Sequence, residues 1–491
     1  MTHQQTQQRP QGLDREILVL GGVVVVGSIT AVLDATIVNV AIPTLGRDLD
    51  ASISTIQWVM TAYLLAFAAV IPLSGWASQR FGAKQVWIGA LVAFVVGSAL
   101  AGSAWSIESL IGFRILQGLG GGLLMPVGQT LLAQAAGPQR MGRVMSVIGV
   151  PMLLAPIFGP VIGGAILDQV SWRWIFFVNL PVGLTAILLA WRLLPRPEAR
   201  GGSKLDVRGL VLLSPGIAVF VYGLSEAGSA GGLGGRALAG ILVGLALAAT
   251  FAVHAVRRGA GALLDLSLLS NRGYAGAVAT NLFLGIALFG ALILLPLYFQ
   301  LVRGESPLDT GLLTMPQGVG AALAMPVAGR LTDRLGARVV VPVGVLLALL
   351  GAVAYTQVGA ETSYPFLAGA LLLVGLGLGA TIVPSMAVAY QSVPREAVVH
   401  ATSTINVAQR VAGSVGTALL AIVLQRRIAA NLPDFHGGVA QIAGLSDSRR
   451  AAVAPQLAHA FGTTFWVAVG LVVAALLPAL LLPRLERREQ A

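Results

Sequence analysis

One carboxylate stands out because of its surroundings in the chain. Asp34 lies in the segment VLDATIVNVAIP, within an otherwise apolar stretch from Ile17 to Pro43. Placing an aspartate at the centre of a membrane helix costs about 2.5–3.5 kcal/mol even on lenient scales, so ionisable residues there usually serve a function. Asp34 is therefore the first candidate for chemistry. The chemistry open to it is the uptake and release of a proton.

Two arginines, Arg114 and Arg410, also lie within apolar stretches. Burial of a carboxylate favours its neutral form, whereas a nearby guanidinium favours its ionised form. Arg114 follows Glu108 by about 9 Å of helix and Asp34 precedes Pro43 by about 14 Å, so both belong to the outer half of the membrane. We expect Asp34 to titrate and Arg114 to tune it. The alternative is a static ion pair that joins two helices.

The elements that must position these residues are membrane-spanning helices. Apolar residues make up 56% of the 491 residues and charged residues only 10%, with a mean hydropathy of +0.84. Soluble domains carry about 25% charged residues, so the sequence predicts an all-α integral membrane protein. The net charge of +11 is typical of basic cytoplasmic loops. No long basic run supports binding to nucleic acid.

Several kinds of chemistry find no support in the sequence. There is no cysteine, which excludes disulfides, thiolate metal sites and cysteine nucleophiles. The five histidines are scattered without metal-ligand spacing. No Gly-Lys dipeptide occurs, so the phosphate-binding loop of ATP-driven pumps is absent. We therefore predict no metal, no cofactor and no enzymatic activity, and a proton gradient as the energy source.

Fourteen segments are long and apolar enough to cross a membrane as helices. An even number places both termini on one side, and most of the 31 Lys and Arg residues lie at the termini or in the loops of that side. The positive-inside rule then places both termini in the cytoplasm. The expected spans are 17–43, 57–78, 86–105, 108–132, 143–167, 173–194, 207–226, 237–256, 274–302, 310–330, 339–358, 364–390, 400–425 and 462–483.

An internal repeat divides the chain. The segment GWASQRFGAK, residues 75–84, recurs as GRLTDRLGAR, residues 329–338, each in a short turn after a span. Two six-helix bundles with two inserted helices between them fit this spacing, and such parallel repeats are typical of transporters. We expect a first bundle, a linker with the inserted helices, and a second bundle with a solvated outer loop. Their ranges are 1–195, 196–270, 271–491 and, for the loop, 426–461.

These turns and several helices resemble the major facilitator superfamily. RILQGLGGG, from Arg114, resembles its helix-4 motif, and GPVIGG, residues 159–164, resembles its helix-5 motif associated with antiporters. LDATIVNVAIP, IQWVMTAYLLA and WRWIFFVNLPVG are similar to segments of the fourteen-helix drug:proton antiporters of the EmrB/QacA type. The turns match its cytoplasmic signature, except that Gln79 replaces the usual Asp. The matching residues are Gly75, Gln79, Arg80 and Gly82, and then Gly329, Asp333, Arg334 and Gly336.

The resemblance implies a major facilitator fold with a substrate path between the two halves. Gly159, Pro160, Gly163 and Gly164 would then form a hinge or seal. The alternative is plain helix packing, because Gly159 and Gly163 form a small-residue face that lets a neighbouring helix approach closely. Ten further residues in the spans are candidates for a substrate cavity, each with the alternative of a bond between helices: Gln57, Trp58, Tyr63, Gln117, Asn281, Phe283, Gln317, Asn406, Gln409 and Arg410.

Taken together, the sequence predicts a proton-coupled antiporter that exports lipophilic, cationic drugs or toxic compounds. It would act as a monomer in a bacterial cytoplasmic membrane, with the bilayer, small molecules and protons as its partners. The nearest alternative is a dedicated exporter of one metabolite, such as a self-made antibiotic or a siderophore. An importer is a further alternative. A membrane enzyme or sensor is disfavoured, since the chain has no soluble domain and no catalytic grouping.

Overall fold

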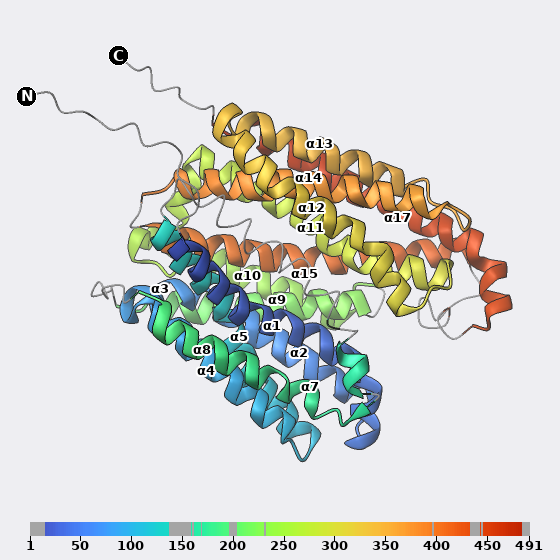
Figure 1. The fold of residues 1–491 in the computed structure, drawn as a ribbon, viewed down its shortest axis with the longest axis horizontal. Coiled ribbons are helices and arrows are strands. Elements are labelled where there is room, and N and C mark those ends of the chain that lie inside the picture. The colour runs from blue at the N-terminus through green and yellow to red at the C-terminus, as the bar shows by residue number, and fades with distance from the viewer. Residues whose placement is uncertain are drawn as a thin grey trace, which may run out of the picture.

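The computed structural model describes residues 15–136, 159, 162–167, 169–195, 204–229, 232–394, 397–432, 442 and 445–483. In these residues the regular structure is helical throughout, which confirms the predicted all-α class (Figure 1). The first half contains α1 (Arg15–Asp48), α2 (Ile53–Val70), α3 (Leu73–Phe81), α4 (Ala83–Gly102), α5 (Ile107–Ala136), α7 (Trp174–Phe177) and α8 (Asn179–Leu193).

The inserted helices and the second half follow. The inserted pair is α9 (Val207–Ser229) and α10 (Gly235–Arg258), joined to the second half by two short 3₁₀ helices, η2 (Gly259–Gly261) and η3 (Leu266–Ser270). The second half contains α11 (Arg272–Leu297), the π-helical turn η4 (Tyr298–Val302), α12 (Pro307–Leu335), α13 (Ala337–Tyr355), α14 (Tyr364–Gln391), α15 (Val398–Asn431) and α17 (Asp447–Leu480).

The helices of the described residues agree with the predicted spans. Twelve of them are long and apolar enough to cross a membrane, and a bent pair makes a thirteenth. This pair is α2 and α3, bent by 56° at Pro72, whose ring fixes the backbone and removes an N–H donor. The remaining predicted span, 143–167, lies largely outside the described residues. The count is compatible with fourteen spans.

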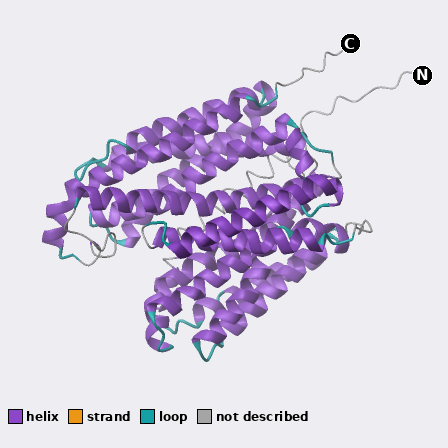
Figure 2. Ribbon diagram, turned by 180° about the vertical axis from the view of Figure 1, so that it is seen from behind, coloured by secondary structure: helices purple, strands orange, loops and turns teal. Residues whose placement is uncertain are grey.

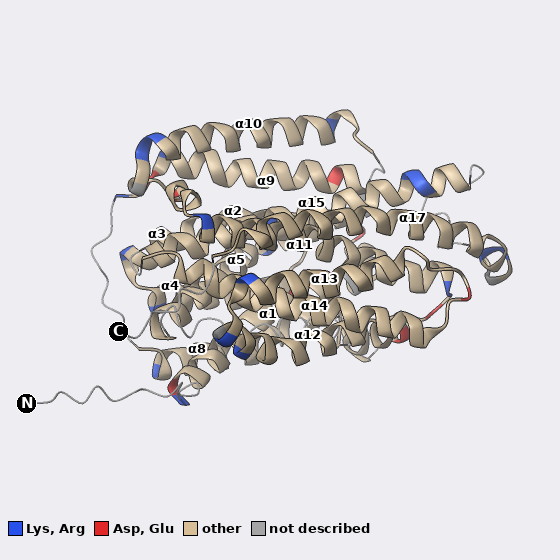
Figure 3. Cartoon of the chain, turned by 90° about the horizontal axis from the view of Figure 1, so that it is seen from above, with Lys and Arg blue, Asp and Glu red and all other residues tan. Residues whose placement is uncertain are grey.

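The inserted helices lie along one side of the molecule, against both halves. The helix α9 packs on α10, on α2 of the first half and on α15 of the second half. Figure 3 shows α10 as the outer member of this pair. Trp58 of α2 stacks on Tyr222 of α9, with 5.8 Å between the ring centroids. Charged residues are sparse along the middle of the helices (Figure 3), as expected for segments surrounded by lipid.

The repeated turns have the same backbone geometry. Gly82 joins α3 to α4 with φ 86°, and Gly336 joins α12 to α13 with φ 83°. Only glycine adopts such positive φ values without strain. The shared conformation supports the internal repeat that the two sequence segments indicate.

The halves are joined at one end and separate at the other. We call the end where α1 begins and α17 ends the terminal end, and the opposite one the far end. Near the terminal end, one hydrophobic core contains residues of both halves, such as Leu132 and Ile405. At the far end each half has its own core, around Phe176 in the first and Phe461 in the second. Figure 2 shows the two sets of helices diverging away from the termini.

Among the described residues, two buried side-chain hydrogen bonds cross between the halves. Ser74 of α3 and Ser403 of α15 lie 3.0 Å apart at their hydroxyl oxygens. Deeper in the molecule, the Asn406 amide donates to Gln129 Oε1 over 2.7 Å. Both bonds lie on the terminal side of the spans, so the structure is closed at this end.

The predicted outer loop 426–461 is largely helical in its described part. The helix α15 continues to Asn431, and α17 already begins at Asp447. Leu457 and Phe461 are buried against the far ends of α11 and α14. Leu457 and Phe461 are four residues apart, so they lie on one face of α17, and the helix occupies much of the segment predicted as a solvated loop.

Candidate functional site

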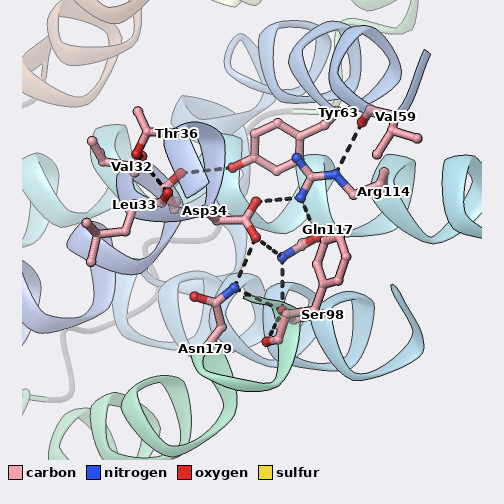
Figure 4. Close-up of polar contacts among 12 residues, drawn as sticks. Val32, Leu33, Asp34, Thr36, Val59, Tyr63, Ser98, Arg114, Gln117 and Asn179 are labelled. Atoms are coloured by element: carbon pink, nitrogen blue, oxygen red, sulfur yellow. Dashed lines mark hydrogen bonds and ion pairs between the residues drawn. The ribbon is translucent and has the colours of Figure 1, made fainter. Parts of the chain in front are cut away.

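Asp34 lies at the centre of a buried polar network in the first half (Figure 4). Its carboxylate is 0% exposed. One oxygen, Oδ2, accepts from Arg114 Nη1 over 2.5 Å. The other, Oδ1, accepts from the Gln117 amide over 2.8 Å and from the Asn179 amide over 3.0 Å. The structure therefore brings together the predicted residues Asp34, Arg114 and Gln117.

Arg114 is held on several sides. Its Nε donates to the Val59 carbonyl over 3.2 Å, and Nη1 also donates to Gln117 Oε1 over 2.7 Å. The guanidinium lies 4.0 Å above the ring of Tyr63, whose hydroxyl donates to the Ala31 carbonyl of α1. Nη2 is buried and has no hydrogen-bond partner among the described residues. The ring and the bonds fix the guanidinium against Asp34.

Two members of the network were not predicted from the sequence. Asn179, at the start of α8, also donates to Ser98 Oγ over 3.0 Å. Ser98 of α4 accepts a further bond from Gln117 over 3.1 Å and donates to the Phe176 carbonyl. Asn179 stands within WRWIFFVNLPVG, so the polar residue in that apolar segment was the available signal. Ser98 offered none, because small hydroxyl residues are common in membrane helices.

Close helix packing brings these side chains within reach. A Cβ at Gly118 would lie 2.5 Å from the Tyr63 carbonyl, and one at Gly122 would lie 2.3 Å from the Phe67 carbonyl. Only glycine allows α5 to approach α2 at this distance. The glycines of RILQGLGGG therefore place Arg114 beside both α2 and α1.

The described glycines of the helix-5 motif pack on α1 beside Asp34. A Cβ at Gly159 would overlap Thr36, and one at Gly163 would lie 3.2 Å from the Ile37 carbonyl. Gly164 has open space around it, and Pro160 lies outside the described residues. This close contact is compatible with a seal between the halves and equally with plain helix packing, so it does not distinguish the two alternatives.

The charges of the network balance. Asp34 and Arg114 form a buried ion pair, and each carboxylate oxygen already accepts at least one hydrogen bond. Buried ion pairs are tolerated when further hydrogen bonds satisfy the remaining groups. In this state, the carboxylate has no oxygen without a partner. A proton that binds the carboxylate removes the charge that Arg114 balances.

A second arginine stacks beside this network. The Arg410 guanidinium, from α15 of the second half, lies 4.2 Å above the ring of Phe67. Phe67 is 5.9 Å from Tyr63, centroid to centroid. An aromatic pair on α2 therefore lies between Arg114 of the first half and Arg410 of the second.

The other predicted cavity residues are dispersed over the molecule. Gln57 is exposed near the far end, and Trp58 faces α9. Asn281 donates to Ser385 Oγ over 2.7 Å and, with Gln409, borders a small cavity in the second half. Gln317 borders an apolar cavity of about 50 Å³ between α11, α12, α13, α14 and α17. Asn406 makes the bond to Gln129 given above, and Phe283 is half-buried beside the shared core.

The repeated turns differ in their contacts. In the first turn, a Cβ at Gly75 would lie 2.8 Å from Ser403 Oγ, whereas Gly329 of the second turn has nothing within 4 Å. Lys84 is buried and donates to the Trp191 and Leu194 carbonyls at the end of α8. Gln79 is half-buried, Arg80 and Arg334 are exposed, and the Asp333 side chain lies outside the described residues. Gly82 and Gly336 occupy the equivalent positive-φ positions.

The described residues contain no group of three His, Cys, Asp or Glu side chains arranged to hold a metal ion. The polar residues that come together are instead one carboxylate, one guanidinium, two amides and a hydroxyl. Such a set can bind and release a proton, and it can change its bonding when its helices move.

Comparisons with known proteins agree with this architecture. The family model described as Major Facilitator Superfamily matches residues 24–417. The chain is 40% identical to a Multidrug resistance protein B homolog of Mycobacterium tuberculosis, over 97% of this chain and 92% of that protein. It is 31% identical to the Tetracenomycin C resistance and export protein of Streptomyces glaucescens, over 84% and 76%.

A solved structure with a similar fold is the proton:xylose symporter XylE bound to 6-bromo-6-deoxy-D-glucose. The TM-score is 0.59 at 16% sequence identity, covering 94% of each chain. At this identity the similarity concerns the fold alone.

Proposed function

The chain belongs to the major facilitator superfamily of membrane transporters, and on this premise we propose that it exports lipophilic compounds in exchange for protons. The multidrug resistance relative supports export of small molecules from a bacterial cell. A proton gradient supplies about 1.4 kcal/mol per pH unit and about 2.3 kcal/mol per charge per 100 mV. This is enough to concentrate a compound outside the cell.

The observation that carries the proposal is the buried Asp34 carboxylate, which accepts a hydrogen bond at each of its oxygens. A proton on this carboxylate removes its charge and weakens the bonds from Arg114 and Asn179. Because Asn179 belongs to α8 and Arg114 to α5, the proton then changes how three helices of the first half are held to one another. In our proposal this change lets the halves rock, and Asp34 releases its proton when the other side opens.

The closed terminal end is the cytoplasmic one in this proposal. Basic loops lie at that end, and the positive-inside rule assigns such loops to the cytoplasm. The structure then corresponds to a state that is sealed toward the cytoplasm by Ser74, Ser403, Gln129 and Asn406. The transporter would work as a monomer in this proposal.

The cationic substrates predicted from the sequence depend on a carboxylate that is free to pair with them. Asp34 is not free in this state, since Arg114, Gln117 and Asn179 occupy both of its oxygens. The Asp34 network in this state therefore supports proton exchange and does not select a cationic substrate.

The test is export of dyes into everted vesicles with an imposed pH gradient. Neutral Nile red, cationic ethidium and anionic pyrenebutyrate cover the three charge types, and a proton uncoupler defines the gradient-driven part. Asp34→Asn should abolish gradient-driven accumulation of every dye that the wild type exports. It should retain gradient-independent exchange of dye across the membrane, which shows that the variant is folded.

Asp206→Asn is the matched control. Asp206 is a buried carboxylate directly before α9, 2.9 Å from His254 Nε2 of α10, and its backbone donors are Gly209 and Leu263. Burial alone would raise the pKa of Asp206, but hydrogen bonds from His254 and from the Gly209 and Leu263 N–H groups lower it. The control thus also removes an ionised buried carboxylate. Gradient-driven export by Asp34→Asn at the wild-type rate would refute the role of Asp34.

A dedicated exporter of one metabolite is the second candidate, favoured by the similarity to the tetracenomycin export protein. A growth-inhibition panel of unrelated drugs and dyes, with and without the gene, distinguishes the two. Protection against many compounds supports multidrug export, and protection against one supports the dedicated exporter.

A further inference from the structure

Arg410 is a charged side chain inside the spans, and no charged group among the described residues pairs with it. It lies twelve residues into α15, which begins at Val398, so its Cα is about 18 Å along the helix from the terminal end. Its guanidinium crosses to the first half and stacks on Phe67. No carboxylate among the described residues forms an ion pair with it, and no hydrogen bond from the guanidinium is present.

The nearest charge network offers Arg410 no compensation. Asp34 already pairs with Arg114, so the two charges of that pair cancel. Tyr63, the aromatic neighbour of Phe67, uses its hydroxyl to donate to the Ala31 carbonyl. In the part of the chain that the structure describes, the charges around Phe67 therefore leave one positive charge uncompensated, that of Arg410.

An uncompensated guanidinium at this depth is unfavourable unless something binds it. Stacking on an aromatic face contributes only part of the compensation, and it leaves the edge of the guanidinium, with its N–H donors, available. Arg410 is half-buried, so part of the side chain remains accessible. Its fork of donors matches the two oxygens of a carboxylate.

We propose that Arg410 binds an anionic group of the exported compound, so that the preferred substrates are lipophilic acids. The inference rests on the proposed export function and names its substrate class. The guanidinium pairs with the carboxylate, phenolate or sulfonate of the substrate, while Phe67 and the apolar residues around it contact the hydrophobic body. The cation predicted from the sequence would instead meet a positive charge at this position.

The probes are three pyrene derivatives of nearly equal size: 1-pyrenebutyrate, its neutral amide 1-pyrenebutyramide, and cationic 1-pyrenebutylamine. Export into everted vesicles is measured for the full-length wild type, Arg410→Gln and Arg410→Lys. Arg303→Gln is the matched control, because Arg303 also stacks on a ring, that of Tyr364, but at the far end of the second half.

For the wild type, we expect half-maximal export at a lower concentration of the butyrate than of the amide. Arg410→Gln should weaken export of the butyrate by at least about tenfold, the effect expected for loss of a charge-assisted hydrogen bond. Export of the amide should stay unchanged. Arg410→Lys should restore part of the butyrate export, and Arg303→Gln should resemble the wild type.

Three results would overturn the inference, and they are distinguishable. If the wild type exports the amide or the amine but not the butyrate, the substrate class is wrong while the proposed function stands. If Arg410→Gln reduces export of the amide and of the butyrate equally, Arg410 acts in a step common to all substrates. If the wild type exports none of the three probes under a pH gradient, the proposed function fails first.

Discussion

Two arginines inside the membrane-spanning region stack on neighbouring rings of α2, and their electrostatic environments differ. Arg114 of the first half lies 4.0 Å above Tyr63 and pairs with Asp34, whose other oxygen is held by Gln117 and Asn179. Arg410 of the second half lies 4.2 Å above Phe67 and has no ionic partner among the described residues.

The difference separates two tasks that a transporter must perform. A neutralised ion pair that shares several hydrogen bonds is suited to changing its bonding when a proton arrives, because one charge decides several bonds at once. An uncompensated cation is suited to capturing a ligand, because the ligand supplies the missing charge. The Asp34–Arg114 pair of the first half would then serve proton coupling, and Arg410 of the second half, together with Phe67 of the first, would serve substrate recognition.

The largest expected effect is on stability. Arg114→Gln leaves the buried Asp34 charge without its counterion, which typically costs about 3–5 kcal/mol. Arg410→Gln removes a cation that pairs with no carboxylate of the described residues, so its unfolding temperature should equal or exceed that of the wild type. Thermal unfolding of both purified variants at neutral pH measures this.

The double variant Asp34→Asn/Arg114→Gln sharpens the result, since it removes both charges and should regain most of the lost stability. An equal loss of stability in Arg114→Gln and Arg410→Gln would abolish the distinction between the two arginines.

A smaller effect is expected from one amide of the network. Asn179→Ala removes a single hydrogen bond to the Asp34 carboxylate, and bonds to charged groups are worth about 1.5–3 kcal/mol. The unfolding temperature should fall, but less than in Arg114→Gln. Ser103→Ala, a hydroxyl deletion on an exposed position of the same half, is the control. A wild-type unfolding temperature in Asn179→Ala would mean that Asn179 does not hold Asp34.

The smallest effect concerns the ring below Arg410. Phe67→Leu keeps an apolar side chain but removes the cation–π contact, which is worth about 0.5–2 kcal/mol. Export of 1-pyrenebutyrate should weaken severalfold, less than in Arg410→Gln, because the charge that binds the anion remains. Export of the pyrene probes into everted vesicles, measured over a range of probe concentrations, tests this expectation. A loss as large as that of Arg410→Gln would assign recognition to the ring instead of the charge.

Much of the fold was predictable from the sequence. Membrane spans are long and apolar, so their positions follow from hydropathy, and the bent pair α2 and α3 still occupies the predicted 57–78 span. Gly82 and Gly336 were identifiable from the repeated turns, because a turn with positive φ requires glycine. The helical parts of 426–461 were not predicted, since their apolar spacing is diluted by polar residues.

The site was predictable in part. Asp34 and Arg114 stand out because charges are rare in spans. The structure places Arg114 Nη1 2.5 Å from Asp34 Oδ2. Asn179 and Ser98 were missed, since a single amide or hydroxyl in an apolar helix has many possible partners. The sequence also did not show that Gln57, Trp58 and Gln317 lie apart from one another. The polarity of a residue within a span does not reveal which face of the helix meets the other half.

The sequence by itself determined which segments lie in the membrane and which few charges they carry, because hydropathy depends on residue type alone. Only the tertiary structure decided how those charges are compensated. Asp34 meets Asn179 from 145 positions away, and Arg410 meets Phe67 instead of an acid. Such contacts depend on how closely glycine-rich helices approach one another and on which faces they present, and neither is a property of a single residue.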